Sequence, residues 1–320
     1  MTSRILSAVL ALACALLAAP ARAQDYPSRP ITIVVPYGPG SYTDNVVRPV
    51  AVALQKVLGQ TVVVDNKAGA NGIVGTQFGA RAKPDGYTLL AGSTTTLAAN
   101  DGLYKSLPYD VRKDFVPIAG LASTSMMFVV RSDFPARTLK EFLAYAAKQP
   151  APMPLAYGSS SAQVAVALLA KESGVKFTGI GYKGTPQAIT DLVGGQVPAA
   201  IVDVANGVPQ IRAGKLHALA ISGTGRSVAA PDVPTLAETW PGTQLVTWVG
   251  LVAPAGTPGA IVDKLSAALA TALATPEIKQ QFITLSTELE PTSAQELGRR
   301  MQRDHVQWLD LIKAAGIQPE

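Results

Sequence analysis

Residues 35–44 read VPYGPGSYTD and join a short apolar run, ITIVV at 31–35, to a helical pattern. Glycine allows backbone conformations and a close ligand approach that a side chain would block. The free N–H groups at the start of the following helix attract negative charge. We therefore predict an anion-binding turn, against the plainer alternative of an ordinary tight connection. The spacing fits neither a dinucleotide fingerprint, which needs a third glycine at Thr43, nor a P-loop, so we expect no cofactor.

The regions around this turn alternate between short β-branched runs and helical patterns, which is typical of a parallel α/β sheet. Thr138 and Glu141 predict a capping box at the start of one helix, and Thr185 with Pro186 predicts the start of another. The strands expected are ITIVV (31–35), TVVVDN (61–66), YTLLA (87–91), SMMFVVRS (125–132), MPLAY (153–157), KFTGIGY (176–182), AAIVDV (199–204), LHALAIS (216–222) and LVTWVGLVAP (245–254).

The C-terminal part changes character and predicts two or three helices, beginning near Thr257, Thr275 and Ser293. The last helix is expected to run to Gly316. Its stripe of Met301, His305, Trp308 and Ile312 has helical spacing, and we interpret it as a face that docks against the first lobe.

The N-terminus indicates export. Arg4 precedes an apolar run from 5 to 19, and Ala21-Arg22-Ala23 supplies a small-x-small cleavage pattern, so residues 1–23 are predicted to be a signal peptide. Lipoprotein cleavage at Cys14 is the weaker alternative. Removal after Ala23 takes away the only cysteine and leaves 320 minus 23, or 297, residues. That length exceeds the size of most single cores, so two lobes and a periplasmic location are expected.

Composition excludes several classes of partner and site. The mature chain would carry 25 basic and 22 acidic residues, a formal charge of +3, and no dense basic tract, so nucleic acid is not an expected partner. Apart from the signal peptide, no segment has the roughly 20 apolar residues that a membrane span needs. With two histidines and no mature cysteine, a zinc site is not supported.

Three segments share one pattern, in which an apolar strand leads into a turn rich in glycine and hydroxyl groups and then into a helix. They are GPGSYTD at 38–44, GSTTT at 92–96 and YGSSSA at 157–162. Ligands of open α/β sheets bind beyond the carboxyl ends of the strands, so these turns can converge on one crevice. Their N–H and O–H donors would suit a small carboxylate.

These segments, with GYKGTPQAITDLVGGQV, IRAGKLHALAISGTGRS and PDVPTLAET, resemble in order and spacing the Bug family, the substrate receptors of tripartite tricarboxylate transporters. The resemblance covers essentially the whole mature chain. It implies a type II periplasmic-binding-protein fold, with crossings near 122–130 and 220–226, lobe 1 at 24–124 plus 226–320, and lobe 2 at 125–225. It also implies a monomeric, non-catalytic receptor for a dicarboxylate, amino acid or aromatic acid, which serves uptake through membrane permease subunits or sensing.

The resemblance also places the ligand site. Ser41 stands where a second glycine is common in the family, and Ser161 replaces another glycine, so specificity differences are expected there. Positions matched to the family pattern or carried by the three turns are Tyr37, Gly38, Gly40, Ser41, Tyr42, Asp44, Ser93, Thr94, Thr95, Ser159, Ser160, Ser161, Tyr182, Lys183 and Asp203.

Three of these residues have plainer alternatives. Tyr182 can line the cleft or be structural, and Lys183 can pair with a distal carboxylate, although a solvated lysine is the more common case. Asp203 can accept a hydrogen bond from a ligand amine or cap the next turn. Pro49 lies in the first helix and predicts either a kink or a late helix start.

The rival function is a secreted serine hydrolase. Residues 158–162, GSSSA, are a near miss to a nucleophile elbow, with Ser160 as nucleophile and Asp203 then a histidine following in order. His217 lies within a strand pattern and His305 on the last helix, however, so neither is expected at the carboxyl end of a strand, where a base would reach Ser160. We therefore favour the receptor.

Overall fold

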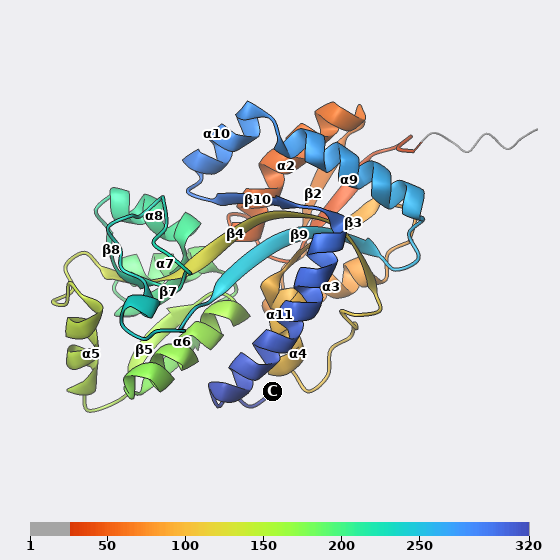
Figure 1. The fold of residues 1–320 in the computed structure, drawn as a ribbon. Helices are drawn as coiled ribbons and strands as arrows, with labels where there is room; N and C mark the ends of the chain where they lie inside the picture. Colours follow the sequence, from red (N-terminus) through yellow and green to blue (C-terminus); the bar gives the residue numbers. More distant parts are fainter. Residues whose placement is uncertain (1–25, 320) are drawn as a thin grey trace, which may run out of the picture.

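The computed structural model describes residues 26–319, and the predicted signal peptide lies outside them. A single ten-stranded sheet runs through the molecule in the order β2-β1-β3-β9-β4-β7-β5-β6, and β10 and β8 each pair with β4 beside this path (Figure 1). The strands are β1 (Ile31–Val35), β2 (Val62–Asn66), β3 (Thr88–Ser93), β4 (Phe115–Arg131), β5 (Met153–Tyr157), β6 (Phe177–Gly181), β7 (Ala199–Asp203), β8 (Leu216–Ile221), β9 (Val246–Pro254) and β10 (Glu288–Thr292).

The sheet is mixed, where the alternating pattern predicted a parallel one. Pairing is parallel among β1, β2 and β3 and among β5, β6 and β7, so each half follows the βαβ prediction. The strands β4, β8, β9 and β10 pair antiparallel. Antiparallel pairing arises because the chain enters and leaves the second half along neighbouring strands that run in opposite directions.

The long strand β4 joins the two halves (Figure 1). Its residues 115–125 pair with β9, and the next residue, Met126, begins the pairing with β7. The predicted strand at 125–132 therefore begins ten residues early, at Phe115. The predicted first crossing, 122–130, lies inside this strand.

The return path to the first half uses a longer segment. After β8 ends at Ile221, the chain reaches the first half at β9, which begins at Val246. In between, Leu236 and Leu245 pack in a cluster with Phe128 and Leu155 of the second half. The lobe bounds stay a prediction, and this packing favours assigning residues 226–245 to the second lobe.

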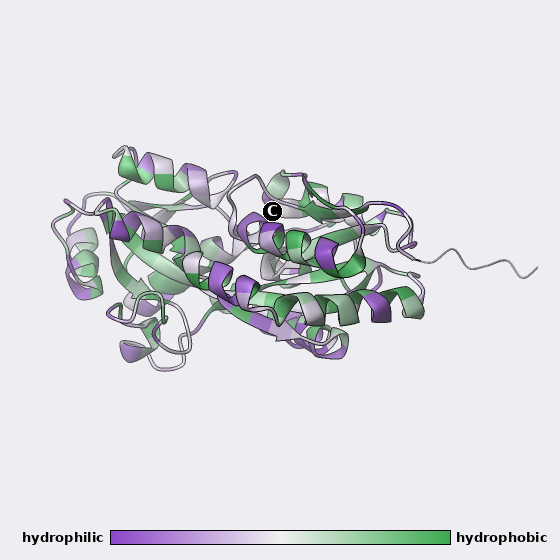
Figure 2. Cartoon of the chain, turned by 90° about the horizontal axis from the view of Figure 1, so that it is seen from above, coloured by the Kyte–Doolittle hydropathy of each residue, from purple (hydrophilic) through white to green (hydrophobic). Residues whose placement is uncertain are grey.

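Helices cover both faces of the sheet (Figure 1), and Figure 2 shows hydrophilic and hydrophobic residues interspersed along them. They are α2 (Tyr42–Leu58), α3 (Ile73–Ala80), α4 (Asn100–Leu103), α5 (Leu139–Ala147), α6 (Ser160–Ser173), α7 (Thr185–Val193), α8 (Val204–Arg212), α9 (Gly259–Leu273), α10 (Pro276–Thr284) and α11 (Ala294–Ala314), with short 3₁₀ turns η1 (Ala70–Gly72) and η3 (Leu236–Glu238) and a π-helical turn η2 (Thr95–Ala99).

Several local predictions are confirmed. The capping box at Thr138 is formed, and the helices expected to begin near Thr275 and Ser293 have those residues at their N-cap positions. Gly184, and not Thr185, is the N-cap of α7. The hydroxyl run at 93–96 does not stay a turn, because residues 95–103 continue as η2 and α4. In the part of the chain that the structure describes, no helix is both long and apolar enough to cross a membrane.

The final helix α11 packs on both halves. Met301 belongs to a cluster with Trp248 and Val252 in the first half, as the docking prediction requires. Trp308 and Ile312, by contrast, belong to the cluster that contains second-half residues of α6. The apolar stripe is one continuous face, but it is long enough to span the junction of the halves.

Pro49 lies inside α2, which begins at Tyr42. The alternative of a late helix start is therefore wrong. Ser41 is the N-cap, and its hydroxyl accepts from the N–H of Asp44, so the predicted anion turn ends in a regular capped helix start.

Candidate functional site

A cavity of about 50 Å³ lies at the carboxyl ends of β1, β3, β5 and β7, where the two halves face each other. Ligands of open α/β sheets bind at this edge. All three predicted hydroxyl-rich turns reach the cavity, together with side chains from β4 and β9. The lining residues are Tyr37, Ser41, Tyr42, Thr43, Ser93, Thr94, Thr95, Met126, Gly158, Ser159, Ser161, Gly184, Thr185, Asp203, Thr247 and Trp248.

Four helix N-termini point at this cavity. Its lining includes the N-cap residues of α2, α6, α7 and α8, which are Ser41, Ser159, Gly184 and Asp203. A helix N-terminus carries a partial positive charge and N–H groups without intrahelical partners, and it therefore favours an anion. Of the described residues that line the cavity, none is a lysine or an arginine. Positive potential here comes from the N-termini of α2, α6 and α7 and from hydroxyl donors, because the Asp203 carboxylate already caps the N-terminus of α8.

Two tyrosines of the lining are buried in different ways. Tyr37 and Ser93 share a hydrogen bond of 2.9 Å between their hydroxyl groups, and burial raises the pKa of Tyr37 to about 12. The hydroxyl of Tyr42 is buried and has no hydrogen-bond partner among the described residues. Burial, and then the carboxylates of Asp203 and of two β10 glutamates, raise the pKa of Tyr42 well above its usual value. Tyr42 therefore stays protonated, and its hydroxyl can donate a hydrogen bond to a ligand.

Asp203 is the acidic side chain of the lining and is 4 % exposed. It is the N-cap of α8, where its Oδ1 accepts from the backbone N–H of Asn206 at 2.9 Å. The Asn206 amide donates to both carboxylate oxygens, at 2.9 and 3.0 Å. Burial raises the pKa of Asp203, and the bonds from Asn206 oppose that shift. Asp203 thus caps α8, which was one of the two roles predicted for it, and its side chain also lines the cavity.

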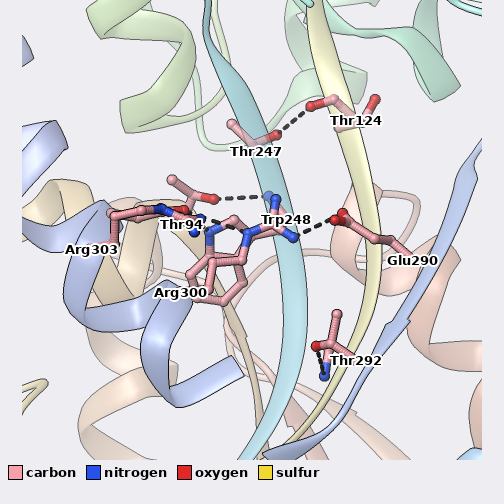
Figure 3. Close-up of polar contacts among 10 residues, drawn as sticks. Thr94, Thr124, Thr247, Trp248, Glu290, Thr292, Arg300 and Arg303 are labelled. Carbon is pink, nitrogen blue, oxygen red and sulfur yellow. Dashed lines mark hydrogen bonds and ion pairs between the residues drawn. The ribbon is translucent and has the colours of Figure 1, made fainter. Parts of the chain in front are cut away.

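Trp248 forms an apolar wall and is held from two sides (Figure 3). Its backbone N–H donates to the hydroxyl of Thr94 at 2.8 Å. Its indole Nε1–H donates to Asp304 of α11 at 2.7 Å, and the Arg300 guanidinium lies 5.6 Å from the ring centre. The neighbouring Thr247 donates to the Thr124 carbonyl of β4 at 3.3 Å. Because Trp248 is 1 % exposed, the wall position is fixed by the fold.

Asp44 lies behind the cavity and outside its lining. Its carboxylate accepts from the backbone N–H of Gly40, from Arg48 and from Asn66, each at 2.9 Å. Burial alone would raise the pKa of Asp44, but these bonds together hold it below its usual range. The residue fixes the first turn against β2 and thereby positions the N-terminus of α2.

Five more predicted residues lie outside the lining. Ser160 is fully buried, and its hydroxyl donates to the Asn100 side chain at 2.9 Å. Tyr182 donates to Asp191 at 2.8 Å. Whether any of these residues contacts a ligand stays a prediction; the others outside the lining are Gly38, Gly40 and Lys183.

The two halves contact each other at the cavity through Thr95 of η2 and Ser161 of α6, whose hydroxyl groups are 2.9 Å apart. Both were predicted site residues from separate turns, and the fold brings them together. The histidines lie elsewhere: His217 is bonded to the Arg137 carbonyl, and His305 faces Asp101.

Sequence reasoning missed Thr43, Met126, Gly158, Gly184, Thr185, Thr247 and Trp248. Gly184 and Thr185 follow β6 in the same strand–turn–helix order as the three recognised turns, so that pattern could have found them. Thr247 and Trp248 lie near the start of β9, within an apolar run that has no turn of the recognised kind. Their place in the cavity depends on the antiparallel pairing of β9 with β3 and β4.

The chain is similar to one protein family and to several solved structures. Residues 46–317 match the family model described as tripartite tricarboxylate transporter family receptor. The structure of periplasmic binding protein BugD is 35% identical, with a TM-score of 0.87, and the match covers 92% of this chain and 100% of that one. MatC from Rhodopseudomonas palustris, solved with bound malate, is 33% identical over 90% of this chain and 100% of its own, with a TM-score of 0.85. A further R. palustris protein, solved with adipate, is 29% identical over 92% and 100%, with a TM-score of 0.89.

Proposed function

The chain belongs to the family of tripartite tricarboxylate transporter receptors, and from that premise we propose that it captures a small carboxylate in the cavity between its two halves. The mixed α/β fold is that of periplasmic binding proteins. The protein would act after export to the periplasm and deliver its ligand to membrane permease subunits or to a sensing pathway.

The observation that carries this proposal is the convergence of four helix N-termini on one cavity whose lining holds no lysine or arginine. N–H groups and hydroxyls can solvate one carboxylate without a counter-ion, because they are already oriented. The relatives solved with malate and adipate hold ligands of the same class.

The rival hydrolase is not supported. The chain's family is a family of binding proteins and not of enzymes. A nucleophile needs a base within hydrogen-bond reach, and the Ser160 hydroxyl instead donates its proton to Asn100. Neither histidine lines the cavity.

Closure of the two halves on the ligand would follow from the contacts that span them. Thr95 and Ser161 meet across the cavity, and residues of both halves line it. A ligand held by both halves favours the arrangement in which they approach. The permease would then distinguish loaded from empty receptor by that arrangement.

Calorimetry tests the proposal directly. Purified protein is titrated with dicarboxylates, amino acids and aromatic acids, and each acid is paired with its amide or ester. At least one acid should bind and its neutral partner should not.

Tyr42→Phe should weaken acid binding several-fold without loss of stability, because the hydroxyl makes no hydrogen bond within the described chain. Tyr145→Phe on the surface of α5 is the matched control. Equal binding of acids and esters would refute the proposal.

A further inference from the structure

We infer that Asp203 makes the site selective for a ligand that carries one carboxylate and, a few atoms away, a hydrogen-bond donor such as an ammonium or hydroxyl group. This inference rests on the proposed function and adds the chemistry of the ligand's second group. The ligand carboxylate would face the N-termini of α2 and α6, and its donor would face Asp203.

The acceptor capacity of Asp203 is the first argument. A carboxylate offers about four acceptor positions. Asn206 fills two on Oδ1 and one on Oδ2. The other side-chain donor that lowers the Asp203 pKa is the neutral hydroxyl of Thr185, which also lines the cavity. A charged ligand donor would bond this buried carboxylate more strongly than a neutral hydroxyl does.

The charge around the cavity is the second argument. The charged groups that act on the Tyr42 hydroxyl are Asp203, Glu288 and Glu290, opposed by Arg300 alone. Arg300 is already paired with Glu290 at 2.8 Å. The second negative charge of a dicarboxylate would therefore lie near the Asp203 carboxylate, and no lysine or arginine lines the described cavity to compensate it. Placing like charges together in a buried site is unfavourable.

The shared lining of the cavity is the third argument. Ser41, Tyr42 and Asp203 line the same cavity, and the Asp203 carboxylate is close enough to the Tyr42 hydroxyl to help raise its pKa. A ligand that contacts the N-terminus of α2 thus lies close to Asp203 as well. Its second polar group must be compatible with an acidic neighbour.

The experiment is a matched ligand series measured by calorimetry and by tryptophan fluorescence, for which Trp248 in the cavity wall is a reporter. At three, four and five carbons, the series contains the unsubstituted acid, the 2-hydroxy acid, the 2-amino acid, the terminal amino acid and the dicarboxylic acid. The tightest ligand should be an amino or hydroxy acid. It should exceed the dicarboxylic acid of equal length by about tenfold or more.

Asp203→Asn is the diagnostic variant, because asparagine keeps the shape and can still cap α8. It should reduce the advantage of the amino acid over the dicarboxylic acid by about tenfold. Asp191→Asn removes the same charge outside the cavity, where Asp191 accepts from Tyr182, and it should leave the order of affinities unchanged. Thermal unfolding of each variant checks that it is folded.

Three results would contradict the inference. A dicarboxylic acid that binds as tightly as the matched amino and hydroxy acids would overturn it alone and leave the proposed function intact. The same holds if Asp203→Asn, folded, keeps the wild-type order. If no acid of the series or of the broader panel binds, the proposed function fails and this inference fails with it.

Discussion

The two walls of the cavity differ in how they are held in place. The first wall, residues 37–43, 93–95 and 247–248, is fixed by contacts with distant parts of the chain, such as Tyr37 with Ser93 and Trp248 with Asp304. In the second wall, residues 158, 159, 161, 184–185 and 203, the caps Ser159 and Asp203 are bonded within their own first helical turn. The caps of the second wall are thus held locally, whereas the first wall depends on distant parts of the chain.

This difference has a consequence for substitutions. A change that disturbs the support of the first wall should lower stability and affinity together. A change at a second-wall side chain that lines the cavity without capping a helix, such as Ser161, should alter affinity or specificity and leave stability nearly constant. Receptors of one family can then acquire new ligands by changes in the second wall, since stability reserves are small.

The largest effect is expected at Asp44, which supports the first wall. Asp44→Ala leaves the Gly40 N–H, Arg48 and Asn66 without their acceptor. Because Arg48 is half exposed and recovers water, we expect a loss of about 2–3 kcal/mol in the free energy of unfolding. Ligand affinity should fall as well, because the N-terminus of α2 loses its anchor. Urea unfolding and calorimetry measure the two effects.

The pH dependence checks the cause of that loss. The pKa of Asp44 is lowered in the folded protein, so its contribution is complete above the unfolded pKa of about 4 and disappears as pH falls through the folded value. The stability gap between wild type and Asp44→Ala should therefore narrow below about pH 4. Asp65→Ala is the control, since its pair with Lys67 is partly exposed and worth about 0–1 kcal/mol. Equal losses at the two positions would contradict long-range fixation of the first wall.

A smaller effect is expected at Asp304, which holds Trp248. Asp304→Ala leaves the buried indole N–H without an acceptor, at a cost of about 1–3 kcal/mol in unfolding free energy. Asp304→Asn keeps an acceptor oxygen and should restore part of the loss. Asp310→Ala, exposed on the same helix, should change nothing. If Asp304→Ala shifts the tryptophan emission and weakens ligand binding, α11 positions the cavity wall. Normal ligand binding by this variant would show that α11 does not influence the site.

The sequence predicted the parallel βαβ units and the capping box at Thr138, because those depend on local spacing and on a side chain that bonds its own first turn. It also predicted nine residues of the cavity lining, all of them in strand-to-helix turns. It missed β10 and the lining residue Trp248, since their places depend on antiparallel pairing between strands far apart in the chain. It also placed Asp44 and Ser160 in the ligand site; their side chains are bonded to protein groups outside the cavity lining, and their contact with a ligand stays a prediction. Spacing cannot tell which way a polar side chain at a helix start will turn.

The smallest effect, and the sharpest local test, compares the adjacent serines 160 and 161. Ser161 lines the cavity and shares a hydrogen bond with Thr95 of the other wall, whereas Ser160 lies outside the lining and donates to Asn100. Ser161→Ala should weaken ligand binding by about 1 kcal/mol, or roughly fivefold, with stability nearly unchanged. Ser160→Ala should cost about 1 kcal/mol of stability, because the buried Asn100 oxygen loses its donor, and should leave affinity within about twofold of wild type. Calorimetry with the best-binding acid and urea unfolding of both variants provide the four numbers. If Ser160→Ala loses as much affinity as Ser161→Ala, the Ser160 hydroxyl must turn from Asn100 to the ligand on binding, and a side chain that supports the fold would then belong to the ligand site as well.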